Sequence, residues 1–175
     1  EEDSISEDQF EDVIDDVADG GVLEEETGEI IQSALEFADT NVKEVFTPRE
    51  NIFALDINGL TNEKLFEVLE TTSFSRIPIY KGTLDNIIGV LYVKTFFKQY
   101  MQKHDIRISK TLSKPYFVSP QIMIDDLFNG FRKRQTHIAF VRDKNMKVIG
   151  MVTMDDVLEE LVGNIGENES KGGNQ

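Results

Sequence analysis

The sequence contains no cysteine, which excludes disulfide bonds, thiolate metal sites and cysteine nucleophiles together. It also lacks tryptophan, has only 4 prolines, and has no run of 18 apolar residues that could span a membrane. The first residues are acidic, so they do not have the pattern of a signal peptide. What remains, with 39% hydrophobic residues and 12 Phe in 175 residues, is enough to build the core of one ordinary domain or two small ones.

Positive charge is missing from the first 40 residues, which contain 16 of the 33 Asp and Glu and no Lys or Arg. The remaining 135 residues carry 17 acidic against 18 basic side chains and are nearly neutral. The net charge of −15 therefore belongs to an acidic leader attached to a balanced region. Because no basic surface stands out, we expect no nucleic-acid partner.

The acidic leader, residues 1–40, has the apolar spacing of two amphipathic helices. Phe10, Val13, Ile14 and Val17 follow the i, i+3, i+4, i+7 pattern, and Gly20-Gly21 should end that helix. A second helix is predicted over residues 24–37, with a buried side made of Ile30, Ile31, Ala34, Leu35 and Phe37. The charges of both helices fit a solvated face better than a cation site, so we interpret the leader as a docking or connecting segment.

The rest of the chain contains one unit of about sixty residues twice. Residues 77–80 match 138–141 and residues 88–91 match 149–152, both at a spacing of 61. Each unit has the pattern strand, helix, strand, strand, helix. We predict an α/β (α+β) fold in which two β-α-β-β-α repeats, residues 41–103 and 107–166, pack pseudosymmetrically. Residues 167–175 are predicted to be a disordered tail.

The stretch from Gly150 to Gly163 starts as an apolar strand and continues as a helix. Thr153 is a suitable N-cap, Asp156 stands three residues on, and Gly163 is a suitable stop. Two interpretations remain open for this edge. Thr153 and Asp156 could form a capping box that satisfies the helix's own N–H groups, or they could bind the hydroxyls of a ribose.

Several motifs resemble known families. The duplicated unit, the Ser75-Arg76-Ile77-Pro78-Ile79 strand and Gly150-x-x-Thr153-x-x-Asp156 resemble a tandem pair of CBS domains, a Bateman module. A narrower resemblance, over roughly residues 20–166, is to the CorC/HlyC family, hemolysin-like membrane proteins related to the CNNM magnesium transporters. The motifs that carry it come in order: Gly21–Glu26, Phe37–Thr40, Val45–Arg49, Gly89–Lys94 and Thr153–Gly163.

That resemblance implies a function as well as a fold. It implies a regulatory, non-catalytic module that binds ATP or AMP, with Mg²⁺ on the phosphates as an option, and forms a homodimer through the CBS pair. It further implies that the chain is the cytoplasmic portion of a plasma-membrane protein that moves magnesium or cobalt. Its partner there would be a transmembrane domain that this chain does not contain. The alternative is a dimerisation scaffold of the same membrane protein whose clefts hold no ligand.

By the same resemblance, one nucleotide cleft combines residues of both repeats. Thr153 and Asp156 would bind the ribose, beside Met151. Residues of the first repeat would enclose the adenine, although plain core is the alternative for its apolar members: Thr47, Pro48, Ile52, Phe53, Phe74 and Ser75. Arg76 and His137, at matching positions of the two repeats, are candidates for phosphate contacts. Further basic candidates, for which surface solvation is the alternative, are Arg49, Arg132, Lys133 and Arg134.

The first repeat departs from the ribose signature. Tyr92 stands where Thr153 stands and Thr95 where Asp156 stands, so the carboxylate is missing and one site per chain is expected. No nucleophile with a neighbouring base is apparent, and no glycine-rich phosphate loop precedes a helix. The two histidines, 33 residues apart, do not have the spacing of a zinc site. We therefore expect neither catalysis nor a structural metal.

Overall fold

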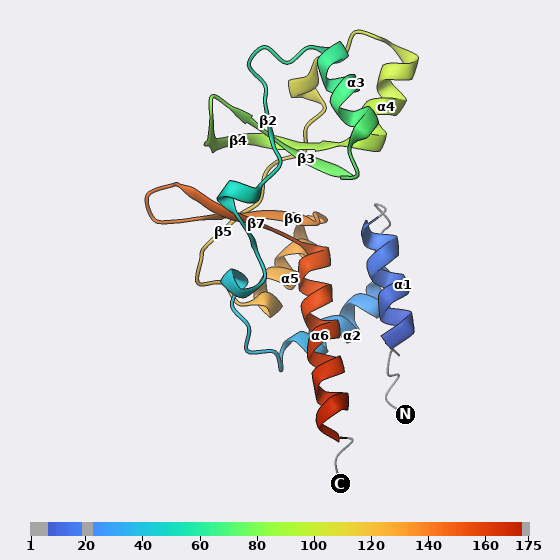
Figure 1. Ribbon diagram of the computed structural model, residues 1–175, viewed down its shortest axis with the longest axis vertical. Helices are drawn as coiled ribbons and strands as arrows, with labels where there is room; N and C mark the ends of the chain where they lie inside the picture. Colours follow the sequence, from blue (N-terminus) through green and yellow to red (C-terminus); the bar gives the residue numbers. More distant parts are fainter. Residues whose placement is uncertain (1–6, 19–22, 173–175) are drawn as a thin grey trace.

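The computed structural model describes residues 7–18 and 23–172. Figure 1 shows two layers of strands one above the other, with helices on the outer side of each. The predicted β-α-β-β-α order is confirmed in both repeats. The predicted end of the first helix at Gly20-Gly21 lies outside the described residues.

The first repeat forms the upper, three-stranded sheet, in the order β2-β3-β4. Its elements are β2 (Leu55–Asp56), α3 (Asn62–Thr71), β3 (Arg76–Lys81), β4 (Thr83–Tyr92) and α4 (Val93–Gln102). Strand β2 has only two residues, and a 3-10 turn, η2 (Arg49–Asn51), capped by Ile52, precedes it. Thr61 begins α3 by accepting the backbone N–H of Lys64 at 3.2 Å.

The second repeat forms the lower, four-stranded sheet, in the order β1-β7-β6-β5. Its own elements are β5 (Phe117–Val118), α5 (Ile124–Arg134), β6 (Ile138–Arg142), β7 (Val148–Thr153) and α6 (Met154–Gly172). The α6 helix continues past Gly163, so the predicted helix end there is wrong. It also includes residues 167–172, for which we predicted disorder, whereas residues 173–175 lie outside the described residues.

Each repeat lends its entry segment to the other. The short strand β1 (Thr47–Pro48), near the start of the first repeat, pairs antiparallel with β7 of the second, Thr47 opposite Met151. In the same way Ser113, near the start of the second repeat, forms a bridge with Val90 of the first, with both N–H to O distances at 3.0 Å. The 3-10 turns η1 (Val42–Glu44) and η3 (Ile108–Lys110) precede β1 and Ser113, respectively. The repeats are therefore interlocked rather than merely adjacent.

Gly150 allows the side chain of Phe46 to pack closely on strand β7. A Cβ added to Gly150 would overlap the ring of Phe46, which passes directly over that strand. Between the two sheets an apolar cluster joins the repeats, and its buried members are Ile87, Val90, Ile138, Phe140 and Val148. The repeats are thus joined by shared strands and a shared core.

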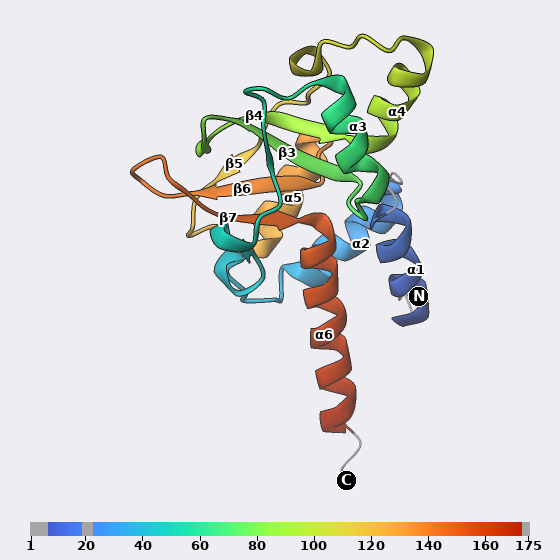
Figure 2. The ribbon, with the colours of Figure 1, turned by 45° about the horizontal axis from the view of Figure 1, so that its top comes forward.

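The leader helices belong to the core of the second repeat. The α1 helix (Glu7–Ala18) runs beside α6, and α2 (Glu25–Leu35) packs on α5 (Figures 1 and 2). Phe10, Val17, Ile31 and Leu35 are buried there, as predicted. Phe37 is 91% exposed, so its predicted burial is wrong; α2 ends at Leu35 and the chain turns Phe37 outward. Within the described residues, no helix combines the length and apolar character needed to cross a bilayer.

Candidate functional site

Thr153 and Asp156 make a capping box at the junction of β7 and α6. The Thr153 N–H donates to Asp156 Oδ2 at 2.8 Å, and the Asp156 N–H donates to Thr153 Oγ1 at 3.2 Å. Both bonds satisfy backbone groups that a helix start leaves open. The pKa of Asp156 is raised, because its burial outweighs the opposing effect of the two bonds with Thr153. The first of the two interpretations of this edge is therefore present in the structure.

Arg76 and His137 meet between the repeats. They occupy matching positions at the start of β3 and just before β6, and Arg76 Nη2 lies 2.9 Å from His137 Nδ1. A guanidinium can only donate, so Nδ1 accepts and the imidazole proton is on Nε2. Burial, helped by the positive charge of Arg76, lowers the pKa of His137 to about 4. His137 is therefore a neutral acceptor at physiological pH.

This contact connects Arg76 to the capping box. The His137 carbonyl accepts the N–H of Met154 at 2.8 Å, and Met154 directly follows Thr153. Arg76 also lies over the ring of Tyr92, 5.4 Å from its centroid, and its buried Nε has no hydrogen-bond partner in the described part of the chain. Arg76 is thus joined, through His137, to the start of α6 in the other repeat.

Asp155 is a member of this group that sequence reasoning missed. Its half-buried carboxyl has a pKa raised to about 6, chiefly by burial and further by Glu159, Asp156 and Asp15, against the opposing effect of Arg76. The only signal in the sequence was its position next to Asp156. Tyr92, which the sequence marked as a departure from the ribose signature, supports the guanidinium of Arg76 instead.

The predicted adenine residues lie along the interlocked segments. Thr47 and Pro48 pair with Met151 and Gly150, and Ile52 packs on the cluster between the sheets. Phe53 and Phe74 are 39% and 53% exposed, and their rings stack on each other with centroids 5.6 Å apart. Ser75 accepts the N–H of Val93 through its carbonyl at 3.0 Å. Their role in binding adenine stays a prediction.

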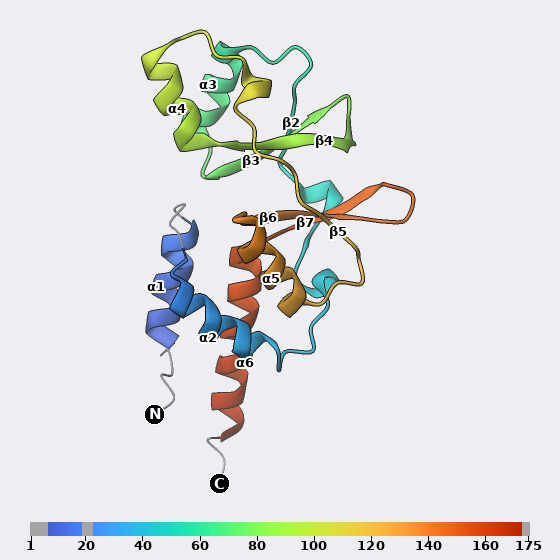
Figure 3. The ribbon, with the colours of Figure 1, turned by 180° about the vertical axis from the view of Figure 1, so that it is seen from behind.

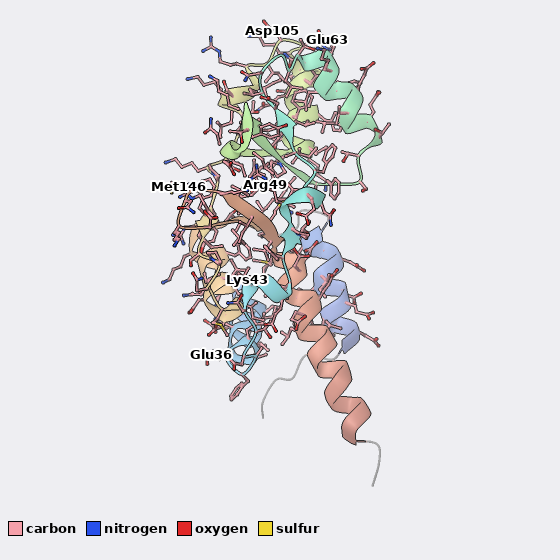
Figure 4. All side chains as sticks on the ribbon, turned by 60° about the vertical axis from the view of Figure 1, so that its left-hand side comes forward. Glu36, Lys43, Arg49, Glu63, Asp105 and Met146 are labelled. Carbon is pink, nitrogen blue, oxygen red and sulfur yellow. The ribbon has the colours of Figure 1, made fainter. Side chains whose placement is uncertain are left out.

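The other basic candidates are engaged elsewhere. Arg49 lies between the repeats (Figure 4), where it forms an ion pair with Asp85 and donates to the Val148 carbonyl at 2.7 Å. Asp85 also accepts the Val148 N–H at 3.0 Å. Burial of Asp85 acts to raise its pKa, but the bonds from Arg49 and Val148 outweigh it and the pKa is lowered. This clamp joins β4 to β7.

Arg132 and Arg134 also lie away from the Arg76 contact. Arg132 lies against Gly28 of α2, and Arg134 lies over the Tyr116 ring at 4.2 Å. Lys133, between them, is exposed on α5. Among the basic candidates for phosphate contacts, Arg76 is therefore the one that the structure joins to the capping box through His137.

Comparison with known proteins shows the family. Residues 104–163, the second repeat, match the CBS domain family. The chain is 35% identical over 143 residues to hemolysin C of Brachyspira hyodysenteriae, covering 82% of this chain and 52% of that protein, so it spans about half the length of this relative.

Two solved structures are similar to it. One is the CBS domain of a bacterial CNNM/CorC family Mg²⁺ transporter in complex with ATP, with 32% identity and a TM-score of 0.66 over 77% of this chain and 96% of that one. The other is a CBS-domain pair with bound AMP from Klebsiella pneumoniae, with 25% identity and a TM-score of 0.65 over 71% of this chain and all of that one. The chain therefore belongs to the CNNM/CorC family, and it corresponds to the CBS-domain region of these proteins.

Proposed function

We propose that this chain is a regulatory CBS pair that binds ATP or AMP in the cleft between its repeats and thereby controls a membrane transporter of divalent cations. Two similar structures are complexes with ATP and with AMP, and the first belongs to a Mg²⁺ transporter. In this proposal the module lies on the cytoplasmic side of the plasma membrane and has no catalytic role. Its partners are its own transmembrane domain and a second copy of the chain.

The observation that carries the proposal is the path from Arg76 through His137 to the capping box. Ribose hydroxyls are neutral donors, which suits the Asp156 carboxylate and the Thr153 hydroxyl. Phosphates are anions and would be repelled by Asp156, so they must lie toward Arg76, whose buried Nε has a donor to offer. In this proposal the acceptor for the ribose, Asp156, and the donor for the phosphates, Arg76, therefore lie at different places, as the ribose and the phosphates of a nucleotide do.

Adenine would then lie near Phe53, Phe74 and Ile52. The two phenyl rings now stack on each other, so they must part before a base can stack on either one. Thr153 and Asp156 must likewise exchange part of their capping bonds for bonds to ribose. In this proposal the nucleotide replaces contacts that these side chains otherwise make with one another.

Binding would be transmitted to the membrane through the helices that start or end at the cleft. The α6 helix begins at the ribose edge, and α1 runs beside it (Figure 2). A nucleotide that prefers one relative orientation of the repeats shifts the population of α6 and α1 positions by its differential affinity. The rival function, a ligand-free dimerisation scaffold, needs neither the free donor on Arg76 nor the acceptor on Asp156.

The test is calorimetric titration of ATP, ADP and AMP, with and without Mg²⁺, on the wild type and on Asp156→Ala. We expect saturable binding by the wild type and at least about tenfold weaker binding by the variant, the loss of one charge-assisted hydrogen bond. Thr61→Ala is the matched control, because it removes a helix cap of the same kind from α3, and it should bind like the wild type. Wild type without millimolar binding would support the scaffold instead.

A further inference from the structure

A cavity lies between α2, the end of α5 and the starts of β6 and α6. Its volume is about 820 Å³, within the range of small-molecule sites. Figure 3 shows α2 and α5 from behind, on the side where α2 packs on α5. Phe131, Met154 and Leu23 give the cavity an apolar wall, while Arg132 and Lys133 give it two cations.

Neither of these two cations forms an ion pair within the described part of the chain. That is notable in a protein of net charge −15, whose neighbouring helix α2 is acidic in its first turn. Cations in the last turn of α5 do favour the helix dipole. However, Arg134 supplies that charge from the outer side, over Tyr116, and is not part of the cavity wall.

Arg132 is held in place by the surface of α2. A Cβ added to Gly28 would lie 3.0 Å from Arg132 Nε, so the absence of a side chain at Gly28 makes room for the guanidinium against the α2 helix. Arg132 is half-buried there, which limits its solvation by water. Gln135, at φ 52, ends α5 and turns the chain so that His137 also reaches the cavity wall.

We propose that this cavity binds a small organic anion, one with a flat apolar group and a phosphate, carboxylate or sulfonate. The apolar group contacts Phe131 and Met154, and the anionic group binds Arg132 and Lys133. Glu25 on α2 is the acidic side chain of the wall and opposes the anion. The cavity adjoins the ribose edge through His137 and Met154, but Arg132 and Lys133, which bind the anion, take no part in the nucleotide proposal.

The test uses 8-anilinonaphthalene-1-sulfonate, a fluorescent molecule with this combination of flat rings and a sulfonate. We expect one equivalent to bind the folded wild type. Arg132→Gln and Lys133→Gln should each bind about tenfold more weakly, because each loses a charge-assisted hydrogen bond. Glu25→Gln should bind more tightly, because it removes the opposing charge.

Two controls separate this site from general attraction and from the nucleotide cleft. Arg134→Gln removes the same charge from the same helix turn without touching the cavity, and it should bind like the wild type. Asp156→Ala should also bind like the wild type. Circular dichroism checks each fold, and Lys133 is exposed, so its replacement keeps the test valid if Arg132→Gln fails to fold. Equal losses in Arg134→Gln and Lys133→Gln, or no saturable binding, would overturn the proposal.

Discussion

Replacing Asp155 by Asn should stabilise the protein at neutral pH. Asp155 is a half-buried carboxyl beside Asp156, Glu159 and Asp15, and its pKa is raised from 3.8 to about 6. A shift of that size corresponds to roughly 3 kcal/mol of ionisation cost above pH 7. Because the group is partly solvated, screening reduces the expected gain to about 1–2 kcal/mol. Asparagine keeps the shape of the side chain and removes the charge.

The pH dependence follows from the sign of the shift. An acid whose pKa is raised on folding stabilises the folded state below its unfolded pKa, and this stability is lost as pH rises through the folded pKa. The wild type should therefore lose stability between about pH 4 and pH 6 relative to Asp155→Asn, and the difference should stay constant above pH 7.

Urea unfolding from pH 4 to pH 8 measures this difference, with Asp105→Asn as the control for an exposed carboxylate. The variant should also bind ATP more tightly, since Asp155 faces Arg76, where the phosphates are proposed to lie. If Asp155→Asn is as stable as the wild type at pH 7.5, or if the difference does not change between pH 4 and pH 7, the electrostatic reasoning is wrong.

Three other predictions concern the interlocked repeats and the leader. Gly150→Ala should lower the free energy of unfolding by about 1–3 kcal/mol, because the added Cβ overlaps Phe46. Gly163→Ala should be neutral or stabilising, because the added Cβ has no neighbour within 4 Å. Urea unfolding of the two variants tests this difference. Asp85→Asn should cost about 1 kcal/mol at neutral pH, and this cost should shrink as the pH falls below 3.8 and through the lowered pKa of the folded carboxyl. A cost that stays the same on acidification contradicts the clamp. The α1 helix has six carboxylates and no cation, and it packs on the acidic start of α6, so the two helices repel each other. Raising NaCl from about 20 to 300 mM screens this repulsion and should slow amide hydrogen exchange around Phe10 and Val17. Faster exchange at high salt would contradict the prediction.

Much of the fold could be predicted because local patterns decide it. The predicted order of strand, helix, strand, strand, helix is an example, since the apolar spacing of a helix such as α5 (Ile124–Arg134) acts within a few residues. The exchange of entry segments could not be predicted, because two-residue strands such as β1 have no periodicity of their own. The burial of Phe37 was wrong for a related reason, since helical spacing does not reveal that α2 ends two residues earlier.

The same limit applies to the site. The capping box of Thr153 and Asp156 could be predicted, because it depends on two residues only three positions apart in the sequence. The internal repeat showed that Arg76 and His137 occupy equivalent positions, but it did not predict their contact. Nothing in the sequence indicated that Arg49 pairs with Asp85 or that Asp155 lies close to Arg76, because both depend on how the repeats face each other.

The most direct test of the central claim is a comparison of ATP with 2′-deoxy-ATP and 3′-deoxy-ATP on the wild type and on Asp156→Asn. If Asp156 accepts a ribose hydroxyl, removing that hydroxyl should weaken binding to the wild type by about tenfold, and it should cost the variant much less. If both deoxynucleotides bind the wild type as well as ATP does, or if each loses equally in both proteins, Asp156 does not hold the ribose.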